Sequence, residues 1–98
     1  MDWPQIAALY LMLAQQAPSP VVEVNRAVAL GLAGDPRAGL EVLDAVDLDD
    51  YQPFHAARAE LLRRSGDRDA ADAAYARAIE LSANAVERAE LERRRAAL

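Results

Sequence analysis

The chain has 98 residues, of which 53% are hydrophobic and 28% are charged, and it contains no cysteine. This composition excludes an intrinsically disordered chain, a disulfide framework and a cysteine-based zinc site. Its formal net charge of -5 disfavours direct binding to nucleic acid, because phosphate backbones attract cationic surfaces. The longest apolar run, residues 6–14, is too short to span a bilayer and lacks the features of a secretory signal. We therefore expect one small cytoplasmic domain.

Six helices are predicted from the positions of Gly, Pro and capping residues. We expect them at about residues 3–16, 20–33, 36–46, 53–65, 68–82 and 84–98. Asp2 is placed to cap the first helix, and Pro18 and Pro20 separate it from the second. Gly34 ends the second helix, because glycine adopts left-handed backbone at little cost, and Asp35 caps the third.

The second half of the chain carries the same signals. An acidic stretch, residues 47–50, connects the third helix to the fourth. Gly66 ends the fourth helix, Asp67 caps the fifth, and Asn84 opens the last. We therefore predict an all-α chain, which agrees with its high alanine content.

Two stretches of the chain repeat each other at an offset of 32 residues. Arg26, Ala27, Leu30, Gly34 and Asp35 are followed by Arg58, Ala59, Leu62, Gly66 and Asp67, and the match continues through Gly39 with Ala71, Leu43 with Tyr75 and Val46 with Ala78. Small residues stand opposite small ones, and large residues opposite large ones. A period near 34 residues indicates a stacked helical repeat, which favours a binding scaffold over a catalytic pocket.

The second copy fits the tetratricopeptide pattern. The matching positions are His55, Arg58, Ala59, Leu62, Gly66, Ala71, Tyr75 and Ala78. We therefore expect a tetratricopeptide-like, right-handed stack of about six antiparallel helices forming a single domain, residues 1–98. Its parts are a partial repeat (1–18), two repeats (20–50 and 52–83) and a capping helix (84–98). The small residues are predicted to let paired helices approach closely, with Tyr75 filling the gap between them.

Three segments resemble the C-terminal extension of a group of bacterial extracytoplasmic-function (ECF) RNA polymerase sigma factors. They are DWPQIAALY (2–10), SPVVEVNRAVAL (19–30) and YQPFHAARAELLRRSG (51–66). In that group a tetratricopeptide-like domain follows the two promoter-recognition domains. The resemblance implies a regulator of transcription initiation that docks a protein partner, whether the sigma domains themselves, RNA polymerase or another regulator. Nothing here resembles the polymerase-binding helices or the helix-turn-helix of such a factor, so we expect no DNA-binding motif in this chain.

The first helix of each repeat lines the concave face in tetratricopeptide arrays, and we place the candidate partner-binding residues there. They are Asn25, Val28, His55, Glu60, Arg63 and Arg64. The same register places Val24 on this face, and the C-terminal helix is an alternative occupant of the groove. Arg26 and Arg58 stand where the pattern has an apolar residue. We interpret them as structural arginines with buried stems and heads paired to a carboxylate or a carbonyl.

Catalytic and metal-binding interpretations find little support in the sequence. His55 is the only histidine, and the acidic stretch 47–50 lacks the glycine and the glutamate of a calcium loop. We therefore expect no enzyme activity, no cofactor, no metal and no membrane contact. Two alternatives stay open: a small-molecule sensor with a polar pocket around Asn25 and His55, and an oligomerisation module. A closed seam around His55 would argue against the sensor.

Overall fold

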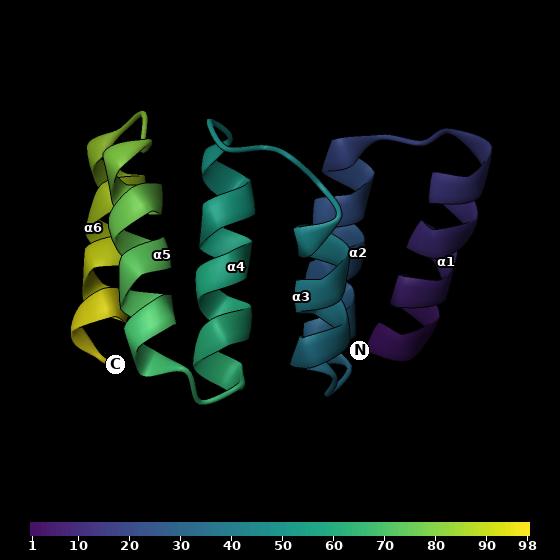
Figure 1. Cartoon of the computed structure of the whole chain (residues 1–98), viewed down its shortest axis with the longest axis horizontal. Helices are drawn as coiled ribbons and strands as arrows, with labels where there is room; N and C mark the ends of the chain where they lie inside the picture. Colours follow the sequence, from purple (N-terminus) through teal and green to yellow (C-terminus); the bar gives the residue numbers. More distant parts are fainter. The chain divides into compact units, whose positions relative to one another are not determined.

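The computed structural model describes all 98 residues and contains six α-helices and no β-strand (Figure 1). The helices are α1 (Trp3–Gln16), α2 (Pro20–Leu32), α3 (Pro36–Asp44), α4 (Gln52–Arg64), α5 (Arg68–Glu80) and α6 (Ala85–Ala96). The prediction of an all-α chain with six helices is therefore confirmed. None of the helices combines the length and the apolar character needed to cross a membrane.

Three predicted helix ends lie two residues too far along the chain. The third helix was expected to reach Val46 and ends at Asp44, the fifth was expected to reach Ser82 and ends at Glu80, and the last was expected to reach Leu98 and ends at Ala96. In the first two cases the chain leaves the helix through a tight turn, in which the amide of one residue donates to the carbonyl three residues before it. The Val46 amide donates to the Leu43 carbonyl at 3.0 Å, and the Ser82 amide donates to the Ile79 carbonyl at 3.1 Å. Such bonds tighten the last turn of a helix and satisfy carbonyls that the helix leaves free.

The chain divides into two compact units, Met1–Leu48 and Asp49–Leu98. In the first unit α2 packs against both α1 and α3, and in the second α5 packs against both α4 and α6. The boundary falls in the acidic connection between the two predicted repeats. Within each unit, consecutive helices run antiparallel (Figure 1).

The hairpin of the first unit turns at Gly34, which ends α2 with a φ of 104°. The Gly34 amide donates to the Gly31 carbonyl at 3.1 Å, and the Asp35 amide donates to the Leu30 carbonyl at 3.0 Å. These two bonds form a Schellman motif, which satisfies carbonyls at the end of the helix. The Asp35 side chain then accepts from the Ala38 amide at 3.1 Å and caps α3.

The hairpin of the second unit has the same turn, 32 residues later. Gly66 ends α4 with a φ of 84°, and its amide donates to the Arg63 carbonyl at 3.1 Å. The Asp67 amide donates to the Leu62 carbonyl at 3.0 Å, and the Asp67 side chain accepts from the Ala70 amide at 3.2 Å. The sequence repeat is therefore also a repeat of backbone structure.

Both hairpins bury small residues at matching positions. Ala27 of α2 and Ala59 of α4 are fully buried, and Gly39 of α3 is buried like its counterpart Ala71 of α5. Side chains of this size let helices pack closely, as the sequence predicts. Tyr75, also fully buried, is among the largest side chains of the core.

Candidate protein-interaction site

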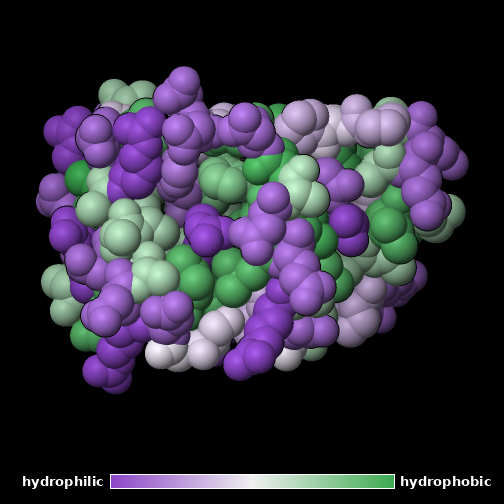
Figure 2. Space-filling view, in the orientation of Figure 1, coloured by the Kyte–Doolittle hydropathy of each residue, from purple (hydrophilic) through white to green (hydrophobic).

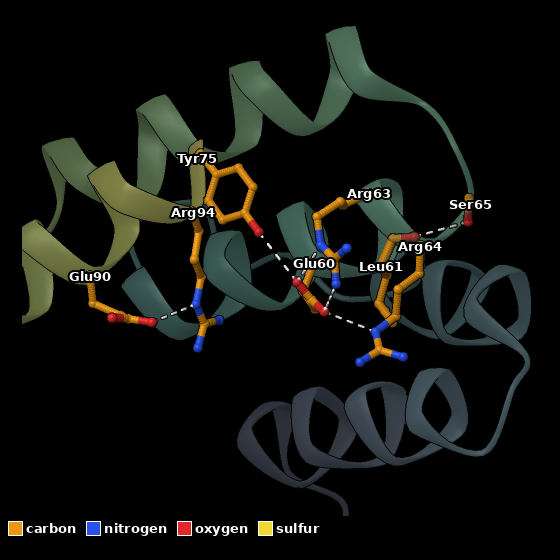
Figure 3. Close-up of polar contacts among 8 residues, drawn as sticks. All are labelled: Glu60, Leu61, Arg63, Arg64, Ser65, Tyr75, Glu90 and Arg94. Carbon is orange, nitrogen blue, oxygen red and sulfur yellow. Dashed lines mark hydrogen bonds and ion pairs between the residues drawn. The ribbon is translucent and has the colours of Figure 1, made fainter. Parts of the chain in front are cut away.

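Glu60 is the centre of a polar cluster in the second unit (Figure 3). Its carboxylate accepts from the Arg63 Nε at 3.0 Å and from one Arg63 terminal nitrogen at 2.6 Å. It also accepts from the Arg64 Nε at 2.9 Å and from the Tyr75 hydroxyl at 3.3 Å. Arg63 and Arg64 lie three and four residues after Glu60 on α4, so all three side chains share one face of the helix. Tyr75 joins them from α5.

The cluster fixes the charge of Glu60. Burial raises the pKa of its carboxyl, but the hydrogen bonds and charges of Arg63 and Arg64 together outweigh burial and lower the pKa to about 2. Burial and the charge of Glu60 raise the pKa of the Tyr75 hydroxyl, which stays protonated and donates a hydrogen bond to Glu60. Glu60 is therefore a carboxylate at every physiological pH.

The two arginines reach solvent, whereas the carboxylate between them is largely covered. The Arg63 side chain is 45% exposed and that of Arg64 38%, against 23% for Glu60. Two guanidinium groups thus stand around a single carboxylate, which leaves this face with a local excess of one positive charge. Exposed guanidinium groups are suited to binding a carboxylate or a backbone carbonyl of a partner.

Arginines of α6 also form ion pairs within the second unit. Arg94 donates to Glu90 at 2.9 Å, Arg93 pairs with the same carboxylate, and Arg95 donates to Asp72 of α5 at 2.7 Å. The hydrogen bond from Arg95 lowers the pKa of the Asp72 carboxyl. These arginines occupy the last turn of α6, where the helix dipole favours cations.

His55 of α4 is buried and lies outside the Glu60 cluster. It is 8% exposed, and its Nε2 donates to the backbone carbonyl of Asp49 at 2.7 Å. The neighbouring Phe54 ring meets it edge to face, with 5.1 Å between ring centroids. Arg77 of α5 donates to the same Asp49 carbonyl and to the Asp50 carboxylate, each at 3.2 Å. His55 of α4 and Arg77 of α5 therefore hold Asp49 and Asp50 in place by hydrogen bonds.

The remaining predicted residues lie on α2 and α4. Asn25 is exposed, Val28 is half-buried, and Arg26 donates to the Glu23 carboxylate at 2.8 Å with a side chain only 20% exposed. Arg58 is half-buried on α4. Val24, which the repeat register placed on the concave face, is instead a core residue with 4% exposure. It lies on α2, which packs against helices on two sides, so fewer of its positions reach solvent than the register assumed.

Sequence reasoning selected Glu60, Arg63 and Arg64 but missed the contributions of Tyr75 and Arg77 to polar contacts. The spacing of three and four residues between Glu60 and the arginines is itself a signal for ion pairs on one helix. No local spacing links Tyr75 to Glu60 or Arg77 to Asp50, since 15 and 27 residues separate them.

Comparison with known proteins finds a relative in Rhizobium meliloti (strain 1021), an uncharacterized protein that is 40% identical over 90 residues. The match covers 90% of this chain and 21% of the relative, so the chain spans about a fifth of the relative's length. No family model matches the chain. No solved structure matches it either. In the relative, the matched segment is thus one part of a considerably longer protein.

Proposed function

We propose that this chain is a protein-interaction domain that corresponds to the C-terminal extension of a bacterial ECF sigma factor. In this role it modulates transcription initiation by docking a protein partner or the sigma domains themselves. The observation that carries the proposal is the repeated hairpin. The hairpins α2–α3 and α4–α5 share their turn, caps and buried small residues, and such repetition of a helical pair is typical of binding scaffolds.

The fold that we propose for this function is a right-handed, tetratricopeptide-like stack. The fit of the second hairpin to the tetratricopeptide pattern supports it. In this arrangement α1 is the second helix of a partial repeat and α6 is a capping helix. The polar surface of α6 suits that role, because the end of a solenoid must face water (Figure 2).

The docking surface that we propose lies in the second unit, on the exposed residues of α4. Arg63 and Arg64 supply guanidinium groups and a local positive charge there. A protein segment that carries a carboxylate fits this chemistry. Glu60 and Tyr75 hold the arginines in place, which reduces the entropy that binding would cost. In the first unit, the exposed Asn25 and the half-buried Val28 of α2 are candidates for a contact of their own.

The comparison and the environment of His55 favour docking over small-molecule sensing. The relative contains the matched segment as a fifth of its length, as expected of one module in a larger protein. The His55 ring is buried and its Nε2 is bonded to a backbone carbonyl, so this nitrogen is not free to bind a ligand. A domain that works beside RNA polymerase would act in the cytoplasm.

Transcription by a full-length sigma factor that carries this domain tests the proposal. Deleting the domain should change the strength or the regulation of its promoter. The paired charge reversal Arg63→Glu with Arg64→Glu should reproduce part of that change, because it inverts the charge of the docking surface. Arg68→Glu is the matched control, since Arg68 is also exposed but lies outside the Glu60 cluster. Unchanged promoter strength and regulation after deletion would refute the proposal.

A further inference from the structure

The first helix carries an apolar surface that no element of its own unit covers. Leu9 is 57% exposed, Met12 55% and Leu13 44%, and these three side chains lie on one side of α1. Ala7, on the opposite side, is the buried residue of the helix. Hydrophobic surface is visible over α1 at the right of Figure 2. Large contiguous apolar patches on a protein surface mark interaction sites.

On this face the order of polar and apolar residues, and the spacing between them, are the same in both directions along the helix. We define the α1 outer face as Gln5, Ala8, Leu9, Met12, Leu13 and Gln16, all of which are exposed. Along its central row, Gln5, Leu9, Met12 and Gln16 follow one another at spacings of four, three and four residues. An antiparallel copy of the helix therefore presents the same row in the same order of spacings.

Antiparallel pairing also matches the side chains across the interface. In this pairing, the residue numbers of two facing residues add up to 21. Leu9 therefore faces Met12 of the partner copy, and Gln5 faces Gln16. Amide side chains can donate and accept at once, so two glutamines can satisfy each other. Ala8 meets Leu13, a small residue against a large one. Parallel pairing would instead set Leu13 against Leu13 and leave a gap between two copies of Ala8.

The charge distribution favours contact between two copies at this helix. The chain carries a net charge of -5, which makes two copies repel each other over most of their surface. The segment from Trp3 to Gln16 contains no Asp, Glu, Lys or Arg. Like charges are thus absent from α1, where an isologous interface would bring the same patch of both copies together.

From these observations we infer that the α1 outer face is a self-association site, at which two copies of the chain pair through antiparallel α1 helices about a two-fold axis between Tyr10 and Leu11. The site goes beyond the proposed docking function, because it lies on a different helix and takes a second copy of the same chain. The centre of this interface is the contact between Leu9 of one copy and Met12 of the other. The two-fold symmetry produces this contact twice.

Molar mass as a function of concentration tests the pairing. Sedimentation equilibrium of the 98-residue chain from about 1 μM to 1 mM should show a reversible monomer–dimer equilibrium. Leu9→Glu with Met12→Glu should raise the dissociation constant by about 100-fold or more, because each substitution places like charges at two symmetric contacts. Both side chains are more than half exposed, so circular dichroism should show unchanged helix content. Val86→Glu is the matched control, since Val86 is 83% exposed on α6 and should leave the equilibrium unchanged.

Cysteine crosslinking tests the register and direction of the pairing. The chain has no cysteine, so an introduced thiol reacts alone. Gln5 and Gln16 are about 16 Å apart along α1, well beyond the Cα separation of about 7 Å that a disulfide tolerates. A mixture of the Gln5→Cys and Gln16→Cys chains should therefore form a mixed disulfide rapidly, whereas each variant alone should not.

Three results would overturn the inference. One is a wild-type chain that stays monomeric at 1 mM. The second is a dimer that the paired glutamates do not weaken. The third is efficient crosslinking of Gln5→Cys with itself, which would indicate a parallel arrangement.

Discussion

The hairpins α2–α3 and α4–α5 have the same backbone and different polar character. Among the pairs that differ at the offset of 32 are Val28 with Glu60, Gly31 with Arg63, Leu32 with Arg64 and Leu43 with Tyr75. The positions that stay alike are those with a geometric demand: a glycine at positive φ, an aspartate that caps a helix, and alanines between close helices. Geometry fixes these few positions. The remaining ones are free to differ, so that the second hairpin carries Glu60, Arg63 and Arg64 where the first has uncharged residues.

The charged positions of the second hairpin depend on each other. Leu43 and Tyr75 are both fully buried, but the tyrosine brings a hydroxyl that needs a hydrogen-bond acceptor. Glu60 supplies that acceptor, and Arg63 and Arg64 in turn neutralise Glu60. No buried side-chain nitrogen or oxygen lacks a partner. The second hairpin thus has Tyr75 where the first has Leu43 in the core. It also has Glu60, the acceptor that the tyrosine hydroxyl needs, where the first has Val28.

Truncation of the two matching core residues should have the largest effect. Tyr75→Ala should lower the free energy of unfolding by about 3–5 kcal/mol and Leu43→Ala by about 2–5 kcal/mol, because each leaves a cavity. Urea denaturation followed by circular dichroism measures both. Tyr75→Phe is the control, and it should cost about 1 kcal/mol because it removes only the hydroxyl. A loss below 1 kcal/mol for either alanine variant would show that the two positions are not equivalent core sites.

Acid should weaken the second hairpin through Glu60. The folded pKa of about 2 lies below the ordinary 4.5, so this carboxylate contributes stability that is complete above about pH 5 and is lost as pH falls towards 2. Because the two arginines are exposed to solvent, screening limits the contribution to about 1 kcal/mol. We expect the difference in unfolding free energy between wild type and Glu60→Gln to shrink from pH 7 to pH 2. A difference that stays constant with pH would contradict the lowered pKa. Val28→Gln is the matched variant in the first hairpin, and its effect should not depend on pH in this way.

Alanine at either turn glycine should cost about 1–2 kcal/mol, because left-handed backbone is unfavourable for residues with a Cβ. Gly34→Ala and Gly66→Ala should cost similar amounts, since no atom lies within 4 Å of the added Cβ at either site and the penalty is conformational. Thermal unfolding measures both variants. Asparagine at the same positions should recover part of the loss, because it tolerates positive φ better than alanine. A large cost at only one of the two glycines would break the equivalence of the turns.

Removal of the helix caps should have the smallest effect. Asp35→Ala and Asp67→Ala each remove one hydrogen bond to a backbone amide and should cost about 1 kcal/mol. Asp35→Asn and Asp67→Asn keep an acceptor and should cost less. Chemical denaturation of the four variants checks this order. Asparagine variants as unstable as the alanine variants would indicate that the carboxylate acts through its charge alone.

Local sequence signals predicted most of the helix map. Gly34 and Gly66 ended helices, and Asp2, Asp35, Asp67 and Asn84 capped them, because each signal acts over a few residues and demands a particular backbone geometry. Where the chain leaves a helix through a single tight turn, as after Asp44 and Glu80, no glycine marks the end. The predicted ends were wrong by two residues there.

The candidate site was predictable only where it is local. Glu60, Arg63 and Arg64 share a turn of one helix, so their spacing suffices. The burial of His55 and Val24 depends on packing between helices, which neither residue type nor register determines. Contacts such as Arg77 with Asp50 join distant parts of the chain and follow only from the fold.

Backbone NMR of the intact chain can show whether one hairpin occurs twice with different faces. Chemical shifts and cross-correlated relaxation report φ at Gly34 and Gly66, and hydrogen exchange reports the amides of Asp35 and Asp67. The account predicts positive φ at both glycines and slowed exchange at both aspartate amides, which bond to Leu30 and Leu62. Negative φ at one glycine, or rapid exchange at only one of the two amides, would contradict it.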